Sequence, residues 1–175
     1  VQSWPFDFVI ASQHLLDHAD PYYPAYWKNK NPSDVIRHYF KETLQNLKSM
    51  QGEYDTLAHL DYIVRYAGSG FTSYHYDEYA DVIDPILRYL IEQDKCLEVN
   101  TAGFKYGLGH PNPCEEVLKR YRQLGGEKIT IGSDGHRPEH IAYNFDHLQD
   151  LLNHIGFQYY CIFQKRKSEF RRLDR

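Results

Sequence analysis

The sequence predicts an α/β protein in which strands and helices alternate around a parallel sheet, either open or closed into a barrel. Three observations predict this class. Short apolar runs recur along the chain, segments with helical spacing of apolar residues separate them, and Gly, Asn or Pro residues stand at the boundaries. At 175 residues the chain is long enough for one compact domain. We therefore expect residues 1–175 to form a single domain.

Five segments are predicted to be strands because each is short, apolar and bounded by polar or turn residues. They are Phe6–Ala11, Thr56–Leu60, Lys95–Asn100, Lys128–Ile131 and Gln158–Phe163. Four segments carry apolar residues at helical spacing, and three of them end near a glycine. They are the segment from about Asn31 to Met50, the segment from about Asp77 to Gln93, Cys114–Leu124 and Phe145–Ile155.

Composition excludes several classes of protein. The net charge of −4 and the pI near 6.2 give no basic field that would attract nucleic acid or an anionic membrane. The one basic stretch, Lys165–Arg175, fits a solvated helix or strand end, with a phosphate-binding surface as the alternative. Cys96, Cys114 and Cys161 lack CxxC spacing, so neither a disulfide framework nor a zinc knuckle is indicated. We expect a cytoplasmic protein without a membrane or nucleic-acid partner.

Polar side chains occur where four of the predicted strands end. His14 follows the first strand, His59 lies at the end of the second, Asn100 ends the third, and Asp134 and His136 follow the fourth. In βα folds the carboxyl ends of the strands meet at one rim, where functional groups gather. Buried polar groups also cost roughly 1–3 kcal/mol unless they are satisfied. We therefore expect these side chains to form a site.

The residue types at this rim favour a metal site. Divalent ions need imidazoles and carboxylates that converge from several elements, and such sites accept Zn, Mn or Fe with modest preference. Asp134 and His136 stand at i and i+2, so a turn at Gly135 can direct both side chains toward one cavity. Each motif alone fits an ordinary turn with a satisfied histidine better than a metal site. Their joint location favours the metal site.

Four strings then carry a resemblance to a known family. FVIASQH, LAHLDYIVRY, LEVNTAG and IGSDGH occur in this order and resemble the later motifs of the PHP (polymerase and histidinol phosphatase) family, in its histidinol-phosphatase branch. The resemblance extends from Phe6 to about Phe170. It implies a distorted TIM-like barrel of seven βα units with two or three divalent ions (Zn, Mn or Fe) at the C-terminal rim.

The resemblance also implies roles for individual residues. Metal ligands are implied at His14, His59, Asp134 and His136. Substrate contacts are implied at Arg65, Lys105 and Asn100, the first two being cationic contacts to a phosphate. Either Asp134 or His136 would act as acid or base, and the sequence leaves that choice open. The family's HxH motif, a further histidine and a bridging glutamate precede the counterpart of Phe6, so we expect the C-terminal portion of the barrel, about five βα units.

Three functions remain in view. The favoured one is a metal-dependent phosphomonoesterase that hydrolyses L-histidinol phosphate to L-histidinol and phosphate in histidine biosynthesis. The second is another PHP phosphoesterase, acting on a different small phosphate ester or on nucleic-acid ends, although the acidic charge balance disfavours nucleic acid. The third is a catalytically silent chain that keeps the fold for binding. The oligomeric state stays open.

Other features have plainer interpretations. Glu98 is expected to be paired inside the barrel, with a role in the site as the alternative. In the loop Asp17–Asn31, aromatic side chains either anchor the loop, which we favour, or wall a substrate pocket. The remaining histidines are expected to be surface or satisfied structural residues, with His18 the best candidate for an exception. They are His18, His38, His75, His110, His140, His147 and His154.

Overall fold

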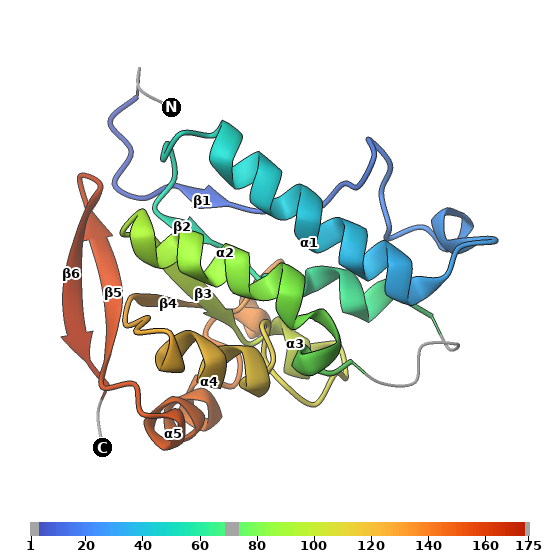
Figure 1. Ribbon diagram of the computed structural model, residues 1–175. Helices are drawn as coiled ribbons and strands as arrows, with labels where there is room; N and C mark the ends of the chain where they lie inside the picture. The colour runs from blue at the N-terminus through green and yellow to red at the C-terminus, as the bar shows by residue number, and fades with distance from the viewer. Residues whose placement is uncertain (1–3, 69–73, 174–175) are drawn as a thin grey trace.

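The computed structural model describes residues 4–68 and 74–173, and it confirms the α/β class (Figure 1). Four parallel strands form one sheet in the order β1-β2-β3-β4. Their bounds are Ile10–Ala11 for β1, Thr56–Leu57 for β2, Cys96–Asn100 for β3 and Ile129–Gly132 for β4. Strand order follows chain order, and helices lie in the connections between neighbouring strands, which agrees with the predicted partial barrel.

Four of the five α-helices form where helical spacing predicted them, and the short α3 was not predicted. The α-helices are α1 (Pro32–Ser49), α2 (Ala80–Glu92), α3 (Ala102–Lys105), α4 (Glu115–Gln123) and α5 (Phe145–Ile155). Short 3₁₀ helices are η1 (Pro24–Trp27), η2 (Tyr62–Tyr66), η3 (Tyr76–Tyr79) and η4 (Pro138–His140). Local signals explain the bounds of α1: the Asn31 side chain accepts a hydrogen bond from the backbone N–H of Ser33, and Gly52 follows the helix at a φ of 79°.

The core lies between the sheet and its helices. Figure 1 shows α1 and α2 side by side, with α4 next to α2. Alternate residues of β3 point to opposite faces, so Leu97 and Val99 enter this core whereas Glu98 and Asn100 face the other side. The core includes the buried side chains of Tyr39, Phe40, Ile83, Leu87, Val117 and Leu118. Within the described part of the chain, no helix combines the length and the apolar character needed to span a bilayer.

The first two strands are shorter than predicted. We expected strands over Phe6–Ala11 and Thr56–Leu60, but ladder pairing covers two residues in each. After β2 the backbone leaves the extended conformation and reaches a φ of 28° at His59. The predicted strand therefore ends early because the chain turns to present His59.

The predicted fifth strand forms, but it does not extend the parallel sheet. β5 (Tyr159–Gln164) pairs antiparallel with β6 (Lys167–Arg172) as a hairpin. The two residues between them, Lys165 and Arg166, both have positive φ, as a tight two-residue hairpin turn requires. The basic stretch is thus mostly the exposed second strand of this hairpin, up to Arg172. All three cysteines are free and buried.

Candidate functional site

The predicted histidine pair comes together at the carboxyl ends of β1 and β2. The Nε2 atoms of His14 and His59 lie 3.3 Å apart, and the ring centroids lie 5.1 Å apart. Two imidazole nitrogens that face each other at this distance present converging donor atoms. Histidine nitrogens that converge in this way are common ligands of zinc-type ions.

His59 is held in a strained conformation by its neighbours. Its φ of 28° is in the left-handed region, and its backbone N–H donates to Glu98 Oε2 at 3.0 Å. Burial and the neighbouring His14 lower the pKa of His59 to about 4, so the imidazole is neutral at pH 7. A neutral imidazole is the form that binds metal ions. Its Nδ1 atom is buried and has no hydrogen-bond partner among the described residues.

Glu98 supports this loop from the interior, as the expectation of a paired residue predicted. Its Oε2 also accepts a hydrogen bond from Asn100 Nδ2 at 2.9 Å. Burial raises the pKa of Glu98. A side chain at Gly132 would collide with this carboxyl group, which explains a glycine at the end of β4. Glu98 therefore positions His59 through its backbone.

Asn100 is buried beneath the rim. Its Oδ1 accepts a hydrogen bond from the backbone N–H of Ala102 at 2.9 Å, so both ends of its amide are satisfied within the chain. It does not line the cavity described below. A contact between Asn100 and a substrate stays a prediction.

The second predicted pair, Asp134 and His136, follows β4. Asp134 has a φ of 47°, and its carbonyl oxygen lies 3.0 Å from His136 Nδ1. Lys105 Nζ donates to the same carbonyl at 3.0 Å and to the carbonyl of Ser133 at 3.3 Å. The ammonium group therefore holds the turn that carries Asp134. His136 is 75 % exposed, so its ring is open to solvent and to a ligand.

Arg65 lies between the two pairs in a cage of aromatic rings. Its Cζ atom is 4.1 Å from the ring centroid of Tyr62, 4.7 Å from that of Tyr66 and 4.3 Å from that of Tyr106. Nη1 lies 3.9 Å from Asp134 Oδ2. The side chain is only 11 % exposed, and Nε has no hydrogen-bond partner among the described residues. A caged guanidinium that lines a cavity is suited to binding an anion.

Arg65, Asp134 and His136 open onto one cavity of about 450 Å³. It is lined by Asp20, Tyr22, Tyr62, Arg65, Tyr66, Tyr106, Asp134 and His136. The predicted residues Arg65, Asp134 and His136 are thus brought together, and His14 and His59 adjoin them through ring contacts with Tyr62.

The loop Asp17–Asn31 combines both roles that its aromatic residues suggested. Trp27 Nε1 donates to the carbonyl of Pro21 at 2.7 Å, which anchors the loop. Tyr22 instead packs edge-on against Tyr66 and walls the cavity. Asp20 was not predicted as a site residue, and the only signal for it was its location in a loop that follows a strand end.

Comparison with known proteins identifies the family. The model of the PHP domain matches residues 2–102. The chain belongs to the PHP domain family. The match confirms the resemblance that the four motifs indicated.

Several relatives of this PHP domain are named as histidinol-phosphatases. A probable histidinol-phosphatase of Clostridium acetobutylicum is 34% identical over 171 residues, which is 95% of this chain and 64% of that protein. One of Thermotoga maritima is 34% identical over 162 residues, which is 92% of this chain and 61% of the relative. The chain thus spans less than two thirds of the length of these relatives.

A solved structure is similar in fold. It is the histidinol phosphate phosphatase of Lactococcus lactis complexed with zinc, L-histidinol and phosphate, at a TM-score of 0.83 and 29% sequence identity. The similarity covers 96% of this chain and 64% of that one. The arrangement of sheet and helices is therefore that of a PHP histidinol-phosphatase.

A different set of metal-type side chains lies outside the cavity of this PHP domain. In residues 4–68 and 74–173, Asp17, His38 and Glu42 are the one group of three whose ligand atoms all lie within 4.8 Å of one another. His38 Nε2 lies 2.9 Å from Asp17 Oδ1, and this hydrogen bond lowers the pKa of Asp17. An exposed ion pair between His38 and Asp17 explains why these side chains lie together, without a metal ion. The four predicted ligands form two separate pairs instead.

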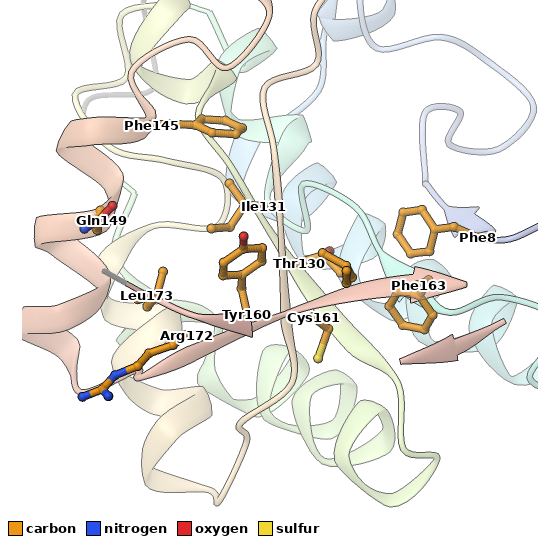
Figure 2. Close-up of a pocket in the computed structure, with 11 residues that line it drawn as sticks. Phe8, Thr130, Ile131, Phe145, Gln149, Tyr160, Cys161, Phe163, Arg172 and Leu173 are labelled. Carbon is orange, nitrogen blue, oxygen red and sulfur yellow. The ribbon is translucent and has the colours of Figure 1, made fainter. Parts of the chain in front are cut away.

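A second cavity, of about 400 Å³, is apolar and lies between β4, β5 and α5 (Figure 2). Phe8 and Phe163 stack at one end of it, with ring centroids 4.8 Å apart. Phe145 lies toward the other end. None of the residues predicted for the site lines this cavity, so it is separate from the strand-end rim.

Proposed function

We propose that this chain carries active-site residues of a metal-dependent phosphomonoesterase that hydrolyses L-histidinol phosphate to L-histidinol and phosphate. One observation carries the proposal: Asp134, His136 and the caged Arg65 line one cavity at the strand ends. The pair His14 and His59 adjoins this cavity through ring contacts with Tyr62. The similarity to a histidinol phosphate phosphatase complexed with zinc, L-histidinol and phosphate supports the choice of substrate.

His14, His59, Asp134 and His136 would hold two or three divalent ions of the zinc, manganese or iron type. The donor set fits such ions, because His59 is a neutral imidazole and its Nε2 faces that of His14. Bound ions of this kind supply Lewis-acid chemistry and lower the pKa of water.

Arg65 would bind the phosphate group of the substrate. Its guanidinium packs against three tyrosine rings and lines the cavity, and an arginine fork can form paired hydrogen bonds with phosphate oxygens. The positive charge would also stabilise the negative charge that develops on the phosphoryl group. Lys105 would act beside it by fixing the turn at Asp134.

Asp134 or His136 would protonate the leaving alcohol oxygen, and substrates with different leaving groups separate the two. An alkyl alcohol leaves poorly without a proton, whereas p-nitrophenolate leaves well without one. Replacing the general acid should therefore slow hydrolysis of L-histidinol phosphate more than hydrolysis of p-nitrophenyl phosphate. Replacing the residue that is not the general acid should slow hydrolysis of the two substrates by the same factor.

Asp20 would select for a cationic substrate. Its carboxylate lines the same cavity as Arg65, and L-histidinol phosphate carries an ammonium group away from its phosphate. We expect Asp20→Asn to raise KM for L-histidinol phosphate by about tenfold, the effect of one lost charged contact. The KM for p-nitrophenyl phosphate, which lacks a cation, should not change.

A panel of phosphate esters tests the proposal. Phosphate release from L-histidinol phosphate should exceed release from sugar phosphates and from 3′- or 5′-phosphorylated oligonucleotides, and Asp134→Ala and His136→Ala should abolish it. Release that prefers the oligonucleotides, or that persists in both variants, would contradict it. A cytoplasmic location fits the three free cysteines.

A further inference from the structure

Tyr62 has an unusual set of neighbours at the strand-end rim. It is the first residue of η2, three positions after His59 and three before Arg65. Its side chain is 8 % exposed, and its ring forms part of the cavity wall. The residue is thus packed on most sides and still borders the space in which a ligand would bind.

The Tyr62 ring packs against both histidines of the first pair. Its centroid lies 5.0 Å from that of His14 at an interplanar angle of 55°, and 4.9 Å from that of His59 at 35°. With 5.1 Å between the two imidazoles, the three rings form a nearly equilateral triangle. Each histidine ring therefore has a fixed neighbour that opposes rotation away from the other.

The same ring also supports Arg65. The guanidinium carbon is 4.1 Å from the Tyr62 centroid, the shortest of its three distances to tyrosine rings. Tyr66 and Tyr106 contact Arg65 but have no ring contact with His14 or His59. Among the described aromatic rings, Tyr62 alone has close ring contacts with both histidines and with the guanidinium of Arg65.

We propose that Tyr62 is a positioning residue that sets the geometry of the metal-binding histidines and of the phosphate-binding arginine together. The proposal rests on the function proposed above, because it assigns His14 and His59 to metal and Arg65 to phosphate. Its physical basis is preorganisation: side chains already held in the binding geometry lose less conformational freedom when they bind. Metal affinity and phosphate affinity then depend on one ring.

The test measures two affinities in four variants. Zinc affinity is measured by competition with a chromogenic chelator in the absence of phosphate, and the affinity for inorganic phosphate is measured by calorimetry on the zinc-loaded protein. The variants are Tyr62→Leu, Tyr62→Phe, Tyr106→Leu and Tyr66→Phe. Circular dichroism and the thermal midpoint establish that each variant is folded.

Tyr62→Leu should weaken zinc binding by about tenfold or more, as loss of a group that orients metal ligands does, and should weaken phosphate binding as well. Tyr62→Phe keeps the ring and should keep both affinities. Tyr106→Leu is the matched control, because Tyr106 packs against Arg65 but has no ring contact with His14 or His59. In this variant phosphate binding should weaken while zinc binding stays at the wild-type value. Tyr66→Phe removes the hydroxyl that donates to Tyr62 and keeps every ring in place, so zinc binding should stay at the wild-type value.

A folded Tyr62→Leu protein with wild-type zinc affinity would overturn the inference, and so would an equal loss of zinc affinity in Tyr106→Leu. If Tyr62→Leu does not fold, Tyr62→Met replaces it, because this side chain fills a similar space without a ring, and the same two affinities decide. A wild-type chain that binds neither zinc nor phosphate would instead refute the proposed function. The two failures are therefore distinguishable.

Discussion

In the helical layer formed by α1, α2 and α4, charged side chains are paired across helices, whereas at the strand-end rim polar groups face a cavity. Arg37 of α1 lies 2.6 Å from Asp81 of α2, and the guanidinium of Arg120 of α4 donates from Nε and Nη2 to the carboxylate of Asp84 of α2. At the rim, His59 instead has a left-handed backbone and a buried nitrogen without a partner among the described residues.

The difference teaches which region stabilises the fold and which region is arranged for a ligand. Strained backbone and incompletely satisfied polar groups persist where the surrounding structure holds them, and they concentrate at functional sites. Substitutions at the rim should therefore remove activity with little loss of stability. Substitutions in the helical layer should do the reverse.

The largest effect is expected at the rim. His59→Asn should lower kcat/KM for L-histidinol phosphate by about a thousandfold, because it removes an imidazole from the metal-binding pair while asparagine tolerates the left-handed backbone. The free energy of unfolding of the metal-free protein, measured in urea, should change little. If the variant lost much of this stability but kept normal activity, His59 would serve the fold and not the site, which contradicts the comparison.

The second effect is expected in the helical layer. Ile83 of α2 is fully buried in the core, so Ile83→Ala should lower the free energy of unfolding by about 3 kcal/mol. At a temperature where the variant is folded, kcat/KM should match the wild type. Ile141→Ala, at a side chain that is 74 % exposed, is the matched control and should leave stability unchanged.

A smaller effect should separate the shape of Arg65 from its charge. Arg65→Lys keeps the positive charge but loses the planar group that stacks on three tyrosines and forms paired hydrogen bonds. We expect KM for the phosphate ester to rise by about tenfold, the equivalent of one good charged contact. Initial-rate kinetics measure it, and an unchanged KM would show that charge alone suffices.

The smallest effect concerns acid stability of the helical layer. The hydrogen bond from Arg120 lowers the pKa of Asp84 below its ordinary value of 3.8. The Asp84 carboxylate of the unfolded chain takes up a proton at a higher pH than that of the folded chain. The stabilisation from this ion pair is therefore complete above the ordinary pKa of 3.8 and is lost as the pH falls through the lowered pKa of the folded protein. The stability difference between wild type and Asp84→Asn should narrow between about pH 5 and pH 2.5. The exposed Asp77→Asn should show no such narrowing.

The helices could be predicted from the sequence because their signals are local. Asn31 and Gly52 bracket α1, Gly156 ends α5, and apolar spacing marks the faces that enter the core. The location of His14, His59, Asp134 and His136 at one rim also followed from strand order, since parallel strands end at the same edge.

Other features could not be predicted from the sequence. The pairing of β5 with β6 is local, but its turn lies at Lys165 and Arg166, two residue types that rarely adopt positive φ, so no turn signal marked it. The remaining features depend on contacts between distant segments, which the sequence does not encode locally. The cage around Arg65 requires Tyr106 from another βα unit, and Asp20 reaches the cavity from a loop. No spacing rule relates these positions.

The central claim is that the rim pairs bind metal ions, and metal content tests it most directly. Elemental analysis of the purified protein after incubation with zinc and gel filtration should find two or three ions per chain, and fewer in His59→Asn and in Asp134→Asn. A wild-type protein that retains no metal, or variants that retain as much as the wild type, would contradict the account.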